Sequence, residues 1–524
     1  MEKGLSNTEP YSYLLMDMAR KDRVRAREFL SLARKYSPDL PIVYFELARA
    51  GLSPSADGIF QGLDYFRQGV RAYGRNFWWG FTIAGLLYAS LFLSFLFSLL
   101  LLLIIRLVMD TGLFLHDGTE DRKRLLLLFV PIIGSFFGPI GLIAGLLFLV
   151  GLYFKKENKA VVYASLVVFL LSPMILRVGE TFFSAPSADL RAVVAVNEGR
   201  DNGYALRFSK GRNDFASKFS YALALKRVGR YEEAIEIYKS LTGRPYKQDP
   251  RVYINLGNTY RAIGDTEAAR SSYLKSIDIG PRPAAFYDLS QIHREMLDFE
   301  KGDEYFIAAA KLDPEAVSRF ASAASVAPSR FVADETLSIS ALWGYAMARG
   351  NHYIHTLGIL IAVIALGMIC GFYFLDRNIQ YRGHRCKRCG DVFCGKCSRA
   401  LTWGEMCPRC FTSLIKIEEV DSKERIARLL SICQSQTRRR NIAKAISLLV
   451  PGGGQIYSGR MLSGLLLLWP FLFAATLLVL SGVPLAGLVP FDHGWVRPFA
   501  ILFMGILYVV SVLNLKRRIS RGWL

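Results

Sequence analysis

Long apolar runs alternate with polar stretches along this chain of 524 residues. An apolar run of about 20 residues is long enough to cross the hydrocarbon core of a bilayer as a helix. Six runs therefore predict membrane-spanning helices: Phe77–Ile105, Leu125–Phe154, Ala160–Leu176, Ile354–Leu375, Met461–Phe491 and Pro498–Leu515. The second contains Pro131 and Gly138-Pro139, so we expect it to be kinked.

The polar stretches between these runs predict separate domains. Residues 1–76 place apolar side chains at helical spacing, which predicts a helical region, and their polar character gives no sign of a signal peptide. Three membrane helices are expected over 77–176, a folded domain over 177–350, one span over 354–375 and a cysteine-rich domain with a basic linker over 376–440. An interfacial segment and two further spans are expected over 441–515, and a basic tail over 516–524. The predicted fold class is a mostly α, polytopic helical membrane protein.

A repeat runs through the domain at 177–350. Three sets of similar residues recur at offsets of 35 and 33 residues: Gly229, Gly264 and Leu297; Ala234, Ala269 and Gly302; Tyr238, Tyr273 and Phe306. These offsets bracket the 34-residue period of the tetratricopeptide repeat, and the stretch from Leu256 to Tyr273 resembles that family. The resemblance implies an α-solenoid with its core at 214–315, which would bind protein partners. An ordinary helical bundle is the alternative.

Three CxxC pairs lie within 25 residues, and thiolates at this spacing are typical ligands of zinc. Seventeen residues separate the second cysteine of the first pair from the first cysteine of the last pair, which suits a single four-cysteine site. The predicted zinc ligands are Cys386, Cys389, Cys407 and Cys410. The middle pair, Cys394 and Cys397, is a candidate for a second or partial metal site, and thiol–disulfide exchange is its alternative role.

The segment from Arg382 to Phe411 resembles the last three cysteine pairs of a FYVE-type zinc finger. That family binds two zinc ions with eight cysteines, so the resemblance implies that the outer pairs here share one ion. The family's first CxxC is missing, because the nearest upstream cysteine is Cys370 in an apolar run. Gly383 replaces the first histidine of the family's tandem pair, which leaves His384 as a possible additional ligand.

A glycine-rich turn stands before the fifth apolar run. The residues Pro451-Gly-Gly-Gly-Gln-Ile-Tyr457 resemble a short module of many bacterial membrane proteins with a Pro-Gly-x-Gly-Gln-x-Tyr core. Ala445–Gly459 is too short for an untilted span, so we predict an interfacial or re-entrant segment in which Gln455 requires a polar partner.

The formal net charge of +21 is concentrated beside the apolar runs. Basic residues mark the cytoplasmic ends of spans, and reduced thiols also belong in the cytoplasm. With six spans, this rule places the N-terminus, the cysteine-rich domain and the C-terminus in the cytoplasm, and the repeat domain outside it. The basic cluster Arg122–Arg124 is the exception, because this topology places it outside the cytoplasm. The bacterial inner membrane is the expected location.

The function that these features predict is a membrane-embedded scaffold that holds protein partners, for example in assembly of an envelope or secretion apparatus. A metal- or redox-responsive regulator is the alternative. The sequence contains no metalloprotease HExxH, hydrolase GxSxG or dinucleotide-binding pattern, so we expect no enzyme. We expect the lipid bilayer and proteins as partners, and neither nucleic acid nor a small-molecule substrate.

Overall fold

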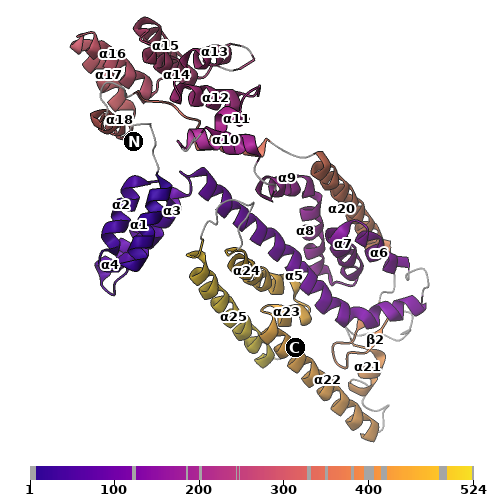
Figure 1. Ribbon diagram of the computed structural model, residues 1–524. Helices are drawn as coiled ribbons and strands as arrows, with labels where there is room; N and C mark the ends of the chain where they lie inside the picture. The colour runs from indigo at the N-terminus through magenta and orange to yellow at the C-terminus, as the bar shows by residue number, and fades with distance from the viewer. Residues whose placement is uncertain are drawn as a thin grey trace. The chain divides into compact units, whose positions relative to one another are not determined.

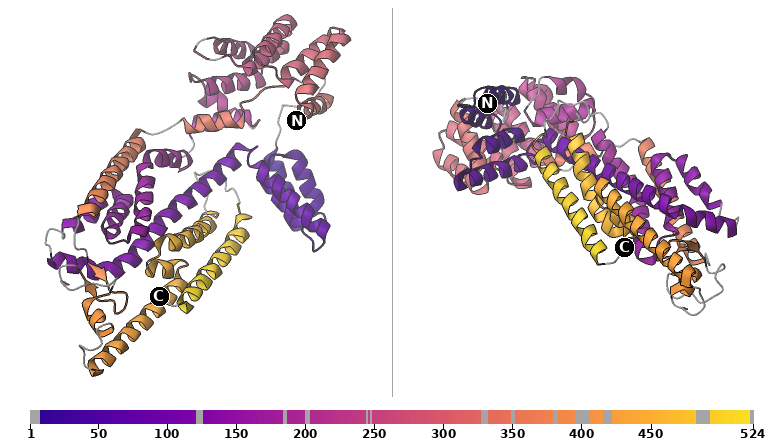
Figure 2. Two further views of the ribbon diagram at one scale, coloured as in Figure 1. Left: turned by 180° about the vertical axis from the view of Figure 1, so that it is seen from behind. Right: turned by 90° about the horizontal axis from the view of Figure 1, so that it is seen from below.

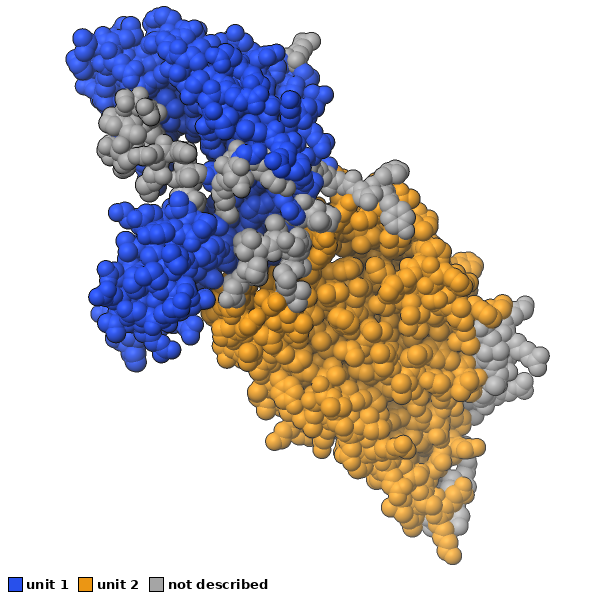
Figure 3. All heavy atoms as spheres, viewed as in Figure 1, with its two compact units in different colours: residues 1–83, 184–349 blue, residues 84–183, 350–524 orange. Residues whose placement is uncertain are grey.

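The computed structural model describes residues 8–120, 126–183, 187–199, 203–243, 245–246, 248–326, 332–348, 352–378, 383–394, 406–414, 422–482 and 493–521. These residues are almost entirely helical, as the sequence predicts. The chain forms two compact units (Figure 3): Met1–Ile83 with Ser184–Arg349, and Ala84–Phe183 with Gly350–Leu524.

The first unit begins with two helical hairpins, which agree with the helical prediction over the described residues 8–76. Their helices are α1 (Glu9–Lys21), α2 (Ala26–Tyr36), α3 (Pro41–Gly51) and α4 (Ala56–Ala72) (Figures 1 and 2). Ser12 joins α1 to α2, because its buried hydroxyl donates to the carbonyl of Ala33 over 3.1 Å. A Cβ atom at Gly69 of α4 would lie 3.0 Å from the ring of Phe45, so glycine lets α3 and α4 approach closely.

The same unit contains the predicted repeats as successive helical pairs. The helices are α10 (Ala188–Asn197), α11 (Tyr204–Phe208), α12 (Phe215–Arg227), α13 (Tyr231–Leu241), α14 (Pro250–Ala262), α15 (Thr266–Ile279), α16 (Pro283–Glu295), α17 (Phe299–Leu312), α18 (Pro314–Val326) and α19 (Ile339–Met347). The turns inside the three pairs have a left-handed residue at the same place, with φ of 85° at Gly229, 83° at Gly264 and 63° at Leu297. The third repeat therefore has the same backbone conformation at this turn as the first two, although its residue is leucine and not glycine.

Small residues lie where the paired helices touch. A Cβ atom at Gly257 would stand 2.6 Å from the ring of Tyr273, and one at Gly302 would stand 2.7 Å from Cγ of Arg294. Ala269 and Tyr273 are fully buried. These contacts explain why the repeat alternates small and aromatic residues, since each small residue leaves room for a ring or a long side chain from the neighbouring helix.

The N-terminal hairpins and the repeats belong to one packing unit. The amide of Asn76 donates to the carboxylate of Glu9 over 2.9 Å, and the N–H of Phe77 donates to Glu198 over 2.8 Å. The ring of Trp343 lies 5.4 Å from that of Phe77. This packing does not fit the predicted topology, in which the membrane separates residues 1–76 from the repeat domain.

The second unit contains the apolar helices. They are α5 (Phe77–Glu120, which starts in the first unit), α6 (Phe129–Ser135), α7 (Gly138–Gly151), α8 (Lys159–Leu170), α9 (Ser172–Phe183), α20 (His352–Asn378), α24 (Met461–Leu480) and α25 (Val496–Ser520). Within the described ranges, four helices are long and apolar enough to cross a membrane, namely α5, α20, α24 and α25. The pair α8–α9, bent by 57°, makes a fifth candidate if it counts as one span.

The predicted second span, Leu125–Phe154, is instead a tight hairpin of α6 and α7. A Cβ atom at Gly134 would lie 2.4 Å from the carbonyl oxygen of Gly141, and one at Gly145 would lie 2.8 Å from Cα of Pro131. Glycine therefore lets the two backbones touch, and the chain reverses at Gly138, whose φ is 81°. By length and composition, the described residues offer four or five candidate spans, where the sequence predicts six. Helix α24 ends at Leu480, and residues 483–491 of the predicted fifth span lie outside the described residues.

The glycine-rich turn lies between α22 (Ser422–Leu449) and α24 and contains the short helix α23 (Gly453–Tyr457). Gly452 donates its N–H to the hydroxyl of Ser511 over 2.8 Å. The amide of Gln455 donates to the carbonyl of Ser511 over 3.1 Å, which supplies the polar partner that the sequence requires. The turn is thus packed against α25, and its kinship with the bacterial module stays a prediction.

Candidate metal centre

The cysteine-rich domain is built from very little regular structure. Strands β1 (His384–Arg385) and β2 (Val392–Phe393) pair antiparallel, and helix α21 (Pro408–Leu414) follows. The turn between the strands is a knuckle in which Cys386 N–H donates to the carbonyl of Asp391 and Gly390 N–H donates to the carbonyl of Cys386. Gly390 has a φ of 91°, so the glycine allows a backbone conformation that other residues resist.

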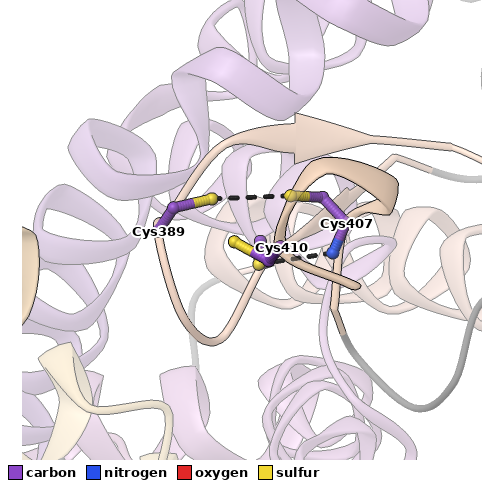
Figure 4. Close-up of side chains that lie close together, drawn as sticks. Cys389, Cys407 and Cys410 are labelled. Carbon is purple, nitrogen blue, oxygen red and sulfur yellow. Dashed lines mark hydrogen bonds between the residues drawn. The ribbon is translucent and has the colours of Figure 1, made fainter. Parts of the chain in front are cut away.

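Two cysteines come from the knuckle and two from the start of α21. The sulfur atoms of Cys386, Cys389, Cys407 and Cys410 all lie within 4.8 Å of one another. Figure 4 shows three of these side chains, Cys389, Cys407 and Cys410, close together. The sulfurs of Cys389 and Cys407 are 3.6 Å apart. A tetrahedral zinc site with Zn–S bonds of about 2.3 Å requires sulfur atoms separated by about 3.8 Å. The four side chains could thus hold a metal ion at a spacing close to that of tetrahedral zinc, and none of them is in a disulfide.

The protonation of the thiols depends on their surroundings. Burial opposes ionisation of Cys386, but backbone N–H groups, that of Cys407 foremost, lower the pKa of this thiol to about 7. Burial raises the pKa of Cys410 to about 11, and it also raises the pKa of Cys389. A divalent cation would therefore have to displace protons from some of these thiols, so metal binding to the group is expected to release protons.

Helix α22 covers one side of the knuckle, a role that sequence reasoning missed. Ser435 donates its hydroxyl to the carbonyl of Cys389 over 2.8 Å, and Arg428 pairs with Asp391 over 3.3 Å. The side chain of Ile432 is buried in the small apolar cluster that includes Phe393. The basic linker predicted for this region is thus a helix that supports the candidate ligands. The basic residues of the linker were the sequence feature from which this supporting role could have been predicted.

The C-terminal part of α5 holds the other side of the module. Gly383 donates its N–H to Asp117 over 2.9 Å, and Arg385 donates to the carbonyl of Met109. The predicted first span ends at Ile105, but the helix continues as a charged extension through the ion pair of Arg106 and Asp110. Figure 1 shows β2 and α21 near the end of α5 and beside α22.

Two of the remaining predicted site residues, Cys394 and His384, are not in the four-sulfur group. Cys394 is buried directly after β2, and His384 is exposed on β1, with its ring 6.4 Å from that of Phe393. Cys397 lies outside the described residues. The second or partial metal site and the exchange role of the middle pair therefore stay predictions.

Comparison with known proteins supports the repeat. A family model described as a tetratricopeptide repeat matches residues 250–282, which comprise α14, α15 and the turn between them. A search of curated proteins gives no match. The match covers one helical pair, and the neighbouring pairs α12–α13 and α16–α17 share its left-handed turn.

Proposed function

We propose that this protein is a membrane-embedded scaffold that binds different proteins on the two sides of a bilayer. The repeat domain would bind one partner, as tetratricopeptide repeats commonly do. The cysteine module, loaded with zinc, would present a small rigid surface to another. One observation carries the proposal: between the repeat helices and the cysteines, α20 is the one described helix that is long and apolar enough to cross a membrane.

The proposed topology has five crossings, by α5, the bent pair α8–α9, α20, α24 and α25. The hairpin α6–α7 would enter and leave the bilayer on the same side, because its arms of 7 and 14 residues are short. Residues 1–76 and the repeats then share one side, in agreement with their common packing unit. The cysteine module and the C-terminus share the other.

Most of the basic clusters beside the spans support this arrangement, whereas Arg67, Arg71 and Arg75 before α5 would then lie outside the cytoplasm. With five crossings, the cluster Arg122–Arg124 moves to the side of the cysteine module, where six spans had misplaced it. The lysines between α7 and α8, the arginines of α22 and the basic end of α25 are on that side as well. Since positive charge marks the cytoplasmic side and thiols remain reduced there, we place the module in the cytoplasm and the repeats outside it. A bacterial inner membrane and the assembly of an envelope or secretion apparatus form the proposed setting, without enzymatic activity.

A metal-responsive regulator is the second candidate. It is favoured by the position of Gly383 and Arg385, which contact α5 directly beside the ligand Cys386. Loss of a metal ion would loosen the knuckle and with it these two contacts.

Single-cysteine labelling tests the topology. Ser31→Cys and Ser240→Cys, each in a background without Cys370 and Cys433, report on the N-terminal hairpins and the repeats, because both serines are exposed. The natural Cys433, exposed on α22, reports on the module side in a chain without Cys370. A membrane-impermeant maleimide should label positions 31 and 240 in intact spheroplasts, and position 433 only after lysis. Equal labelling of positions 240 and 433 before lysis would contradict a two-sided scaffold, and opposite behaviour of positions 31 and 240 would contradict five crossings.

A further inference from the structure

Helix α4 is held close to the beginning of the apolar helix α5, because hydrogen bonds fix the corner between them (Figure 1). Helix α4 ends at Ala72, and α5 begins at Phe77. The N–H groups of Arg75 and Asn76 both donate to the carbonyl of Ala72, over 3.0 and 3.2 Å. The side-chain oxygen of Asn76 then accepts the N–H of Trp79 in the first turn of α5 over 3.2 Å. The corner and the helix ends on both sides of it belong to the first unit.

Helix α4 exposes four large apolar side chains. We call them the apolar stripe: Ile59, Phe60, Leu63 and Val70, which are between 46% and 71% exposed. Successive residues of a helix are rotated by about 100°, so Ile59, Leu63 and Val70 fall within an arc of about 40°. Phe60 lies about 60° beyond Leu63. The buried glycines of α4 lie on another side of the helix and pack against α3, so the stripe is an open face of the hairpin.

Two arginines border the apolar stripe. Arg67 and Arg71 lie about 40° and 80° from Leu63 around the helix. Both are exposed, and among the described residues neither forms an ion pair. The acidic residues of α4, Asp57 and Asp64, lie farther round, about 120° and 100° from Leu63. The arginines are also in the half of the helix that leads to α5, whereas the first acidic residue is at its beginning. Positive charge is thus placed beside the stripe at the end nearest to α5.

This arrangement matches the interface of a bilayer better than the surface of a protein. Aliphatic and aromatic side chains insert at the boundary of the acyl chains, and arginines reach from there to the phosphate groups. The chain itself brings α4 to the membrane, since Ala72 and Phe77 can be at most about 18 Å apart. A lipid contact also accounts for Arg67 and Arg71 on the side that is not cytoplasmic, where the rule for basic residues does not explain them.

We propose that α4 lies on the surface of the bilayer that α5 crosses, with the apolar stripe among the upper acyl chains and Arg67 and Arg71 on the headgroups of anionic phospholipids. The bound ligand is thus the phosphate of a lipid in the leaflet where α5 begins. This inference goes beyond the scaffold function and rests on it in one respect, namely that α5 is a membrane span. It follows that the N-terminal hairpins are attached to the membrane by two elements, the beginning of α5 and the stripe of α4.

Quenching of a fluorescent label by spin-labelled lipid tests the contact. The full-length protein is reconstituted in nanodiscs, with the label on Leu63→Cys in a chain without Cys370 and Cys433. Gln61→Cys is the matched control, because Gln61 is exposed and lies about 160° from Leu63 around the same helix. The chain without an introduced cysteine gives the background of the remaining thiols. A nitroxide near the headgroup end of the acyl chains should quench the label at position 63 at least about threefold more strongly than at position 61. Equal quenching at the two positions would overturn the proposal.

The two arginines and the charge of the lipid test the headgroup contact. In nanodiscs that contain phosphatidylglycerol, Arg67→Gln with Arg71→Gln should reduce quenching at position 63 at least about twofold, since each basic residue near an anionic surface strengthens association by roughly fivefold. In nanodiscs of phosphatidylcholine alone, the same two substitutions should change little. Both arginines are exposed, so the double variant should fold as the unaltered chain does. An equal effect of the substitutions in both lipids would contradict binding of anionic headgroups.

A label in α5 separates this proposal from the topology on which it rests. Leu91 is 50% exposed in the apolar run of α5, and a nitroxide deep in the acyl chains should quench a label on Leu91→Cys. Quenching at position 91 without quenching at position 63 would overturn the placement of α4 alone. If the label at position 63 were then also shielded from dissolved iodide, the occupant of the stripe would be a protein and not lipid. Absence of quenching at position 91 would overturn the span and the proposal together.

Discussion

The repeat domain and the cysteine module achieve a defined structure in opposite ways. The repeat domain buries large side chains such as Tyr238 and Tyr273 between helical pairs, and each pair is supported by its neighbours. The module has two strands of two residues each, one helix of seven residues and a small apolar cluster in its described part. Its cluster consists largely of the cysteines themselves, so its apolar burial is slight.

The difference teaches where the stability of each region originates. A solenoid gains free energy from contacts between adjacent repeats, and loss of one contact weakens it by a limited amount. A small domain with little core depends on metal binding for folding, so loss of one ligand removes most of its stability. The module also contacts α5 and α22. Residues in and beside the knuckle make these contacts, so the contacts depend on the shape of the knuckle.

The largest effect is expected from loss of a metal ligand. The full-length protein purified under reducing conditions should hold about one zinc ion per chain at the four-sulfur group, and Cys410→Ser should remove it. Because the knuckle then lacks its cross-link, the amides of residues 383–394 should exchange several orders of magnitude faster. Elemental analysis and hydrogen exchange measure the two results.

Cys433→Ser is the matched control, because Cys433 is exposed on α22. It should retain the metal. Cys394→Ser should have a milder effect than Cys410→Ser. Retention of a full equivalent of zinc by Cys410→Ser would show that the ligand set is wrong.

An intermediate effect is expected from overfilling a helix contact in the solenoid. Ala269 is fully buried in the core that contains Tyr273 and Ile254, so Ala269→Trp should force the helices apart. The expected cost is about 1–3 kcal/mol of unfolding free energy or more. Thermal unfolding of the full-length protein measures this cost, with hydrogen exchange of the amides of α14–α17 as the readout. Ser271→Trp, at an exposed position of the same helix, should change little. Equal stability of the two variants would disprove the repeat alignment.

The smallest effect is a gain at the irregular turn. Leu297 has a φ of 63° and is 75% exposed, so its side chain adds strain and little packing. Leu297→Gly should relieve the strain, and after the entropic cost of glycine the net stabilisation should be about 0.5–1 kcal/mol. Gly264→Leu, at the equivalent turn, should be destabilising by a similar amount. Chemical denaturation measures both, and a loss of stability in Leu297→Gly would show that the leucine side chain packs usefully.

The sequence by itself determined the features that have a short period or a fixed spacing. The recurrence of Gly229, Gly264 and Leu297 predicted the helical pairs, because each pair folds mainly on itself and its neighbour. The distance from Cys389 to Cys407 grouped the same four cysteines whose sulfur atoms lie together in the structure. Apolar runs likewise indicated α5, α20, α24 and α25, since their length and composition alone make them candidate spans.

Only the tertiary structure decided the features that depend on contacts between distant segments. An apolar run such as Leu125–Phe154 has the same composition in one helix or in two, and the close approach of Gly134 to Gly141 makes it a hairpin. The pairing of Asn76 with Glu9 and of Phe77 with Glu198 unites residues 1–76 with the repeats. The segment at 332–337 has no pattern of its own, because its conformation comes from hydrogen bonds to side chains 45 to 140 residues away in sequence. The local sequence does not indicate which distant residues a segment will contact, because only folding of the chain brings these residues together.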